Sequence, residues 1–201
     1  MTSEYDPVFG PPSVGASSSS DLAEARELFE EASRPFLGSP LPWLGWAILF
    51  PAAALLTGAV AQSFAWVGVL LLWSATILVG GFVEIATIRS RRPAVSSSLA
   101  SWVFQAQANL SLIAVVLSLA LLFYGRPEAI PAVWLLVLGH SLFMLGGLAF
   151  GPVRQAGLLY QVGGILTLLP LFDPMVVLAV TTFVANGWIG LKVAQRNRAV
   201  H

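Results

Sequence analysis

The chain has 201 residues, of which 57% are hydrophobic and only 10% are charged, whereas about a quarter of the residues in soluble domains are charged. Ten basic and ten acidic residues give a formal net charge of zero, so no nucleic-acid partner is expected. The chain contains no cysteine, which excludes disulfides, thiolate metal sites, iron–sulfur clusters and cysteine nucleophiles. This composition predicts an integral membrane protein whose main surroundings are the lipid bilayer.

Two hydrophilic segments precede the apolar part of the chain. Residues 1–20 are rich in Pro, Gly and Ser, predict a flexible tail, and lack the apolar core of a secretory signal peptide. Residues 21–34 predict an amphipathic cytoplasmic helix that begins with Asp21 and Glu24 in a pattern resembling a capping box. Its glutamate-rich face would be repelled by anionic headgroups. We therefore expect it to pack on the protein's own cytoplasmic face or on a protein partner, which would bind through residues 1–34.

The rest of the chain predicts an all-α fold, a polytopic six-transmembrane-helix bundle in one domain over residues 41–195. Each of six apolar stretches is long enough to cross a hydrocarbon core of roughly 30 Å. A turn near Gln62-Ser63 is expected between the first two helices, and the spacing suggests three consecutive hairpins. The helices are expected at about 41–61, 64–88, 99–123, 131–150, 153–171 and 174–194.

The basic residues predict an orientation. In a six-helix arrangement nine of the ten lie on one side of the membrane, and only Arg126 lies on the other. The positive-inside rule then places both termini in the cytoplasm, including a short tail over 196–201. An odd number of helices would separate Arg89 from Lys192 and Arg196.

Polar side chains within the spans are the candidate functional residues. Helix rise places the imidazole and amide groups about 12 to 15 Å from the predicted cytoplasmic ends, and the carboxylate about 6 Å from its end. Similar depths on separate helices predict a shared polar layer inside the bundle. This layer is either dry and paired by interhelical hydrogen bonds or lines a polar path. The candidates are His140, Asn109, Gln161, Asn186, Glu84 and Gln105.

Glu84 lies near the predicted cytoplasmic face. We expect an ion pair there between Glu84 and either Arg89 or Arg154, because a carboxylate one turn below the interface can meet a guanidinium. The alternative is a proton-accepting or cation-binding group at the inner mouth of a path.

The sequence contains few residues that could bind a cofactor or carry out catalysis. His140 could ligate a haem, but a second membrane histidine is needed, and the other histidine, His201, is the terminal residue. One histidine and one glutamate at different depths form neither a metal site nor a nucleophile with its base. We predict no cofactor, no metal and no catalytic residue.

The tryptophans and the small residues predict how the helices are placed and packed in the membrane. Trp46 and Trp134 lie near helix ends and are expected as interface anchors, while Trp188 and Trp73 lie deeper and are expected to be packing residues. The Ala54-x-x-x-Gly58 and Gly147-x-x-x-Gly151 motifs predict close helix approach within the chain, and a homo-oligomer stays open.

The order of these features resembles that of an uncharacterised group of small bacterial inner-membrane proteins, in which a short acidic helix precedes six spans. The matching stretches are DLAEARELFEEASRPFL and IPAVWLLVLG, and the resemblance covers about residues 21–195. It implies six spans, a location in a bacterial inner membrane and no catalytic residue. The Ser-rich tail before Asp21 departs from the group.

Two functions follow as hypotheses. The first is a non-enzymatic membrane protein of accessory or interaction type. The alternative is a small permease or channel with the polar layer along its path.

Overall fold

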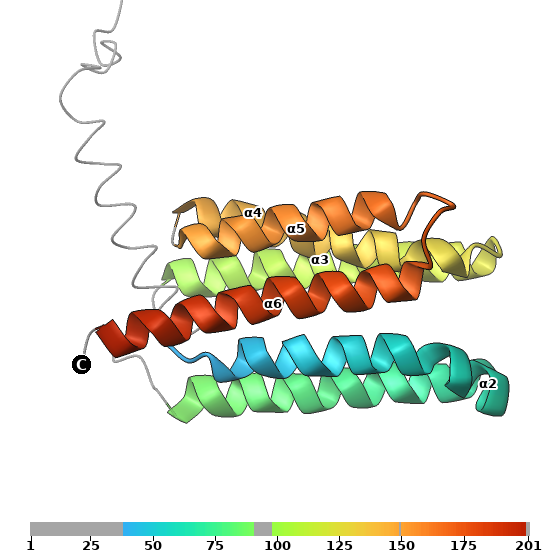
Figure 1. Cartoon of the computed structure of the whole chain (residues 1–201), viewed down its shortest axis with the longest axis horizontal. Helices are drawn as coiled ribbons and strands as arrows, with labels where there is room; N and C mark the ends of the chain where they lie inside the picture. The colour runs from blue at the N-terminus through green and yellow to red at the C-terminus, as the bar shows by residue number, and fades with distance from the viewer. Residues whose placement is uncertain (1–37, 91–97, 149, 200–201) are drawn as a thin grey trace, which may run out of the picture.

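The computed structural model describes residues 38–90, 98–148 and 150–199, and in these residues it is all-helical. The predicted tail and acidic helix lie outside the described residues. The elements are α2 (Leu41–Ser90), α3 (Ser98–Phe123), a short 3-10 turn η2 (Pro127–Ala129), α4 (Ile130–Leu148), α5 (Gly151–Leu166) and α6 (Pro174–Ala199). All five α-helices run roughly along one axis (Figure 1).

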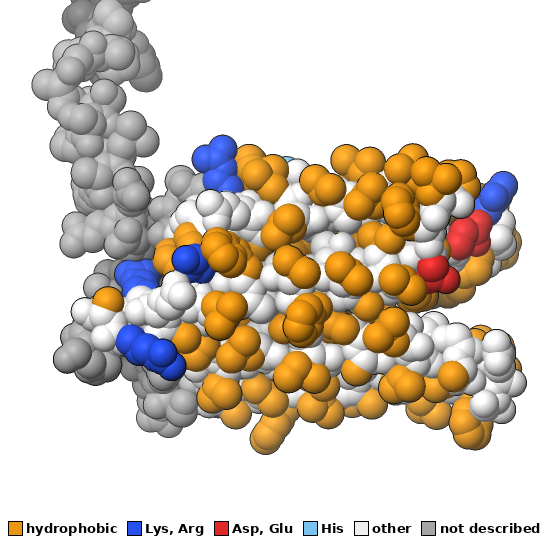
Figure 2. Space-filling view, viewed as in Figure 1, with side chains coloured by type: hydrophobic (Ala, Val, Ile, Leu, Met, Phe, Trp, Pro, Cys, Tyr) orange, Lys and Arg blue, Asp and Glu red, His pale blue; other side chains and the backbone are white. Residues whose placement is uncertain are grey.

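Four of these helices, α2, α3, α4 and α6, are long and apolar enough to cross a membrane. The distribution of side chains fits a lipid environment. Buried positions are mostly small, such as Ala54, Ala114 and Ala156, whereas Leu78 and Phe82 are more than 70% exposed. Large apolar side chains cover the face seen in Figure 2. In water such a surface would be unfavourable, and in lipid it is the expected one, because small interior residues let helices approach closely.

The helix α2 folds back on itself. Ala65 has φ 52° and ψ −159°, and the two arms on either side of it lie next to each other (Figure 1). The indole nitrogen of Trp73 donates a hydrogen bond to the Thr57 hydroxyl across the arms at 3.1 Å. The turn expected near Gln62-Ser63 thus lies at Ala65. A Cβ on Gly68 would lie 2.9 Å from Cγ1 of Val60, so Gly68 provides the room in which the chain reverses.

The tightest helix contact joins α4 and α5. A Cβ on Gly139 would lie 2.9 Å from the Gly157 carbonyl oxygen, and a Cβ on Gly146 would lie 2.7 Å from Cα of Arg154. Two glycines on each helix, Gly139 and Gly146 on α4 and Gly157 and Gly164 on α5, therefore bring the backbones together. A side chain at these positions would hold the helices apart. The Ala54/Gly58 and Gly147/Gly151 motifs do not mark this contact, and a Cβ on Gly58 or Gly151 would meet no atom within 4 Å.

The last helix, α6, connects α2 with the pair α4 and α5, because it packs against all three of these helices. The hydroxyl of Thr182 and the side chains of Ile189 and Val193 on α6 are completely buried. Asp173 caps its start by accepting hydrogen bonds from the amides of Met175 and Val176 at 2.8 and 3.0 Å. The helix continues to Ala199, five residues beyond the expected end.

Most described basic side chains lie at one end of the bundle, together with Glu84, whereas the other described acidic side chains lie at the opposite end. Figure 2 shows several basic side chains at the end where α2 begins and α6 ends, and acidic side chains beside one basic side chain at the other end. Arg89, Arg154 and Arg196 belong to the first end, while Arg126, Glu128 and Asp173 belong to the turns at the second. The bundle is therefore electrostatically asymmetric along its axis.

Candidate functional site

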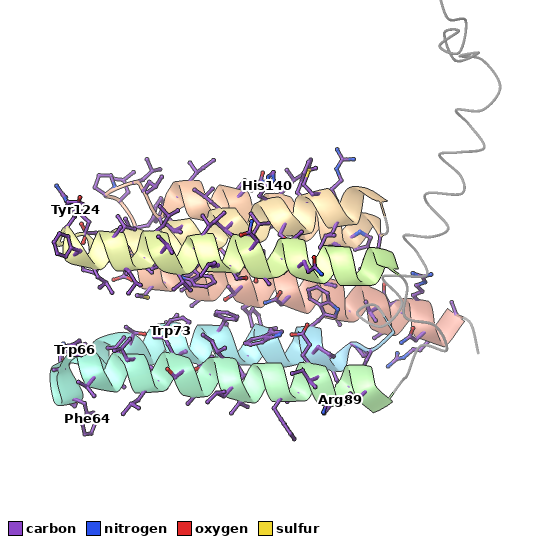
Figure 3. All side chains as sticks on the ribbon, turned by 180° about the vertical axis from the view of Figure 1, so that it is seen from behind. Phe64, Trp66, Trp73, Arg89, Tyr124 and His140 are labelled. Atoms are coloured by element: carbon purple, nitrogen blue, oxygen red, sulfur yellow. The ribbon has the colours of Figure 1, made fainter. Side chains whose placement is uncertain are left out.

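The predicted polar residues do not gather in one interior layer. His140, Asn109 and Gln105 are exposed at the surface of the bundle, Gln161 is half-buried, and Asn186 is buried. Figure 3 shows His140 at the outer edge of the bundle. Depth along the helix axis was predicted from residue counts, but the direction of a side chain around the axis depends on which neighbours the helix packs against.

The outward direction of His140 follows from the glycine beside it. Gly139 packs against α5 so closely that a Cβ on Gly139 would lie 2.8 Å from the backbone nitrogen of Gln161. Successive residues on a helix are about 100° apart, so His140 turns away from that contact. Neither His140 nor Asn109 hydrogen-bonds to another side chain among the residues that the structure describes.

The orientation of Asn109 has a similar cause on α3. The Ser141 hydroxyl on α4 hydrogen-bonds to the Gln107 amide oxygen, so Gln107 is the α3 side chain that points toward α4. Asn109 follows two residues later, about 200° around the helix, and faces the other way. Gln107 was not among the residues predicted from the sequence, because nothing in the sequence marks it as the α3 amide that pairs with α4.

The buried polar contact in the interior joins α5 and α6. The Asn186 amide and the Tyr160 hydroxyl share a hydrogen bond, and the two residues are 4% and 2% exposed. Tyr160 had not been predicted as a partner, since a tyrosine amid apolar residues is also typical of a membrane interface. Asn186 is thus buried and has a polar partner on the neighbouring helix.

Glu84 contacts a tryptophan, where we had expected an arginine. The indole nitrogen of Trp46 donates a hydrogen bond to its carboxylate oxygen at 3.1 Å, and Gly80 leaves space for the Trp46 ring. Arg154 lies over the Phe143 ring, with its Cζ 4.7 Å from the ring centroid. Between residues that the structure describes, the one ion pair is Arg126–Glu128 at 3.7 Å. The hydrogen bond from Trp46 joins the two arms of α2 because they run antiparallel, which sequence position alone does not reveal.

A groove between α5 and α6 was not anticipated. It has a volume of about 660 Å³ and is lined by side chains from both helices. Trp188, expected to pack inside, instead borders this groove and is 38% exposed. Its indole nitrogen donates a hydrogen bond to the Gln155 amide oxygen at 3.2 Å. The sequence signal that could have revealed it is Gly187, a residue without a side chain beside a large ring.

No group of three or more His, Cys, Asp or Glu side chains that could hold a metal ion occurs in the described part of the chain. Comparisons with protein-family models, curated proteins and solved structures give no match.

Proposed function

We propose that this protein is a non-enzymatic integral membrane protein of accessory type, which associates with a protein partner inside the membrane. The observation that carries the proposal is the exposure of His140 and Asn109. Each lies near the middle of its helix, more than 10 Å from either end at a rise of 1.5 Å per residue. A polar group that faces hydrocarbon without a partner is unfavourable, and a neighbouring helix can satisfy it.

The proposal includes a position in the membrane. We propose that both arms of α2 and the helices α3 to α6 cross a bacterial inner membrane six times, as three hairpins. Both termini then lie in the cytoplasm. The separation of charge between the two ends of the bundle supports this orientation, because cytoplasmic loops are enriched in Lys and Arg. Residues 1–34 then lie on the cytoplasmic side, where they would add a second contact with the partner.

A permease or channel has weaker support. Asn186 is buried and paired with Tyr160, while His140 and Asn109 face outward. These directions do not align the candidate residues along one path through the described bundle.

The experiment uses a photo-reactive amino acid at Met144, which is 57% exposed and one turn from His140 on α4. The full chain is irradiated in its native membranes, and adducts are identified by mass. We expect an adduct with a protein, which is either a different chain or a second copy. Val180 on α6 is equally exposed and serves as the control position, where lipid adducts are expected.

Substitutions at His140 give the chemical specificity. His140→Leu removes the hydrogen-bonding group, and His140→Asn keeps one. Since an interhelical hydrogen bond contributes about 0.6 to 2 kcal/mol, His140→Leu should reduce the protein adduct roughly three- to thirty-fold, and His140→Asn should restore much of it. Lipid adducts alone at Met144, or a protein adduct that is indifferent to His140→Leu, would overturn the proposal.

A further inference from the structure

The groove between α5 and α6 has an apolar floor that is open to the surroundings of the bundle. Its apolar lining includes Leu158, Leu159 and Val162 from α5 and Phe183, Val184 and Leu191 from α6. The stretch of α6 from Phe183 to Leu191 covers about 12 Å at a rise of 1.5 Å per residue. This length is close to one leaflet, which is about half of a hydrocarbon core of roughly 30 Å.

The packing of the two helices explains why the groove exists. Toward the far end the helices are in close contact, because Gly163 faces Thr181 and a Cβ on it would lie 2.7 Å from the threonine Cγ2. Toward the basic end, Gly187 leaves open space, and a Cβ there would meet no atom within 4 Å. Phe183 and Trp188, on either side of Gly187 along α6, both line the groove.

The basic end of the groove carries the polar groups. Nζ of Lys192 lies 4.6 Å from the centroid of the Trp188 ring, and Cζ of Arg196 lies 5.6 Å from that of Phe150, which precedes α5. Nζ of Lys192 donates one hydrogen bond, to Gln195 at 3.2 Å, and an ammonium has two more donors. Among the described acidic residues, Glu128 and Asp173 lie at the opposite end of the bundle, and Glu84 at the basic end accepts a hydrogen bond from Trp46. Lys192 therefore lies against Trp188 at the edge of the groove, with Arg196 one turn further along α6, and neither forms an ion pair with a described carboxylate.

We propose that this groove binds one acyl chain of an anionic phospholipid, with the lipid phosphate held by Lys192 and Arg196. The apolar side chains exclude water from the acyl chain, and the two cations select the negative headgroup. The choice of occupant follows from this combination: a helix of a partner protein would not need two cations at the headgroup level, while a phospholipid supplies both an apolar chain and a negative charge. The proposal assumes that α5 and α6 lie in a membrane, but it does not depend on the partner contact proposed for α4.

The test measures which lipids stay bound. The full chain is placed in nanodiscs of equal parts phosphatidylglycerol and phosphatidylcholine with matched acyl chains, then released, and retained lipids are counted by native mass spectrometry. We expect phosphatidylglycerol to be enriched over phosphatidylcholine. Because a basic residue near the membrane surface contributes about fivefold in anionic-lipid binding, Lys192→Gln should reduce the enrichment by roughly that factor, and Lys192→Arg should preserve it.

A second pair of variants tests the groove itself. Gly187→Leu places a side chain in the open space and should reduce retained lipid of both kinds. Gly58→Leu makes the same change at an exposed position of α2 where a Cβ also meets nothing within 4 Å, so it should leave retention unchanged. Equal retention of the two lipids by the wild type would refute headgroup selection. Retention that Gly187→Leu leaves unchanged, or that both leucine variants reduce alike, would refute the groove as the site.

Discussion

The glycine contact between α4 and α5 gives the most direct test of the packing. Gly146→Ala adds one methyl group at a position where its Cβ would lie 2.7 Å from Cα of Arg154 and from the Val153 carbonyl carbon. Ordinary contacts of a Cβ begin near 3.4 Å, and the Arg154 backbone nitrogen would lie closer still, so the two backbones must separate by more than about 0.7 Å. Both neighbouring atoms belong to the backbone of α5, which cannot move aside by changing a rotamer.

The size of the effect follows from this geometry. Overpacking a close-packed interior by one methyl group costs roughly 1 to 3 kcal/mol, and alanine recovers up to about 1 kcal/mol through its higher helix propensity. We expect Gly146→Ala to lower the free energy of unfolding by about 1 to 2 kcal/mol. Gly58→Ala is the matched control in α2: it gains the same propensity and meets no atom within 4 Å, so it should be neutral or stabilising by up to about 1 kcal/mol.

The assay is reversible unfolding of the full chain in mixed micelles, followed by circular dichroism as the denaturing detergent fraction rises. The two variants have the same composition, so effects on the unfolded chain largely cancel. If Gly146→Ala were as stable as Gly58→Ala, the backbones of α4 and α5 would not be in contact at this point. The inference that the contact turns His140 outward would then fail as well.

Two further predictions concern the ends of the bundle. Ala65 has a positive φ that favours glycine, so Ala65→Gly should raise the free energy of unfolding by about 1 kcal/mol in the same assay, and a loss of stability would contradict the strained turn. Because the chain has no cysteine, single cysteines report orientation directly: in sealed cells, Glu128→Cys should react with a membrane-impermeant maleimide, whereas Ala199→Cys should react only after permeabilisation. The reverse pattern of labelling would refute termini in the cytoplasm.

The polar residues show where reasoning from sequence reaches its end. Counting residues along a helix places His140, Asn109 and Asn186 at similar depths, but a membrane helix has apolar neighbours all round and little periodicity to indicate its buried face. For α4 the buried face is determined by Gly139 and its contact with Gly157 on α5, and the two glycines act only as a pair. Depth could therefore be predicted, while the direction of each side chain could not.

The same reason applies to Glu84 and Trp188. A carboxylate close in sequence to arginines suggests an ion pair, because a sequence shows directly only which residues are neighbours along the chain. Its hydrogen-bond partner, Trp46, is 38 residues away and comes close only because α2 reverses at Ala65. Trp188 was expected inside, but the missing side chain at Gly187 leaves it at the edge of a groove.

The sequence by itself determined that the chain is helical and apolar enough to lie in a membrane, because these properties depend on composition and on runs of neighbouring residues. It also separated most basic residues from Arg126 once the helices were counted. Only the tertiary structure decided that α4 and α5 form the closest pair, that His140 and Asn109 face outward, and that a groove opens beside Lys192. These features depend on the rotation of each helix about its own axis, which contacts between distant segments determine.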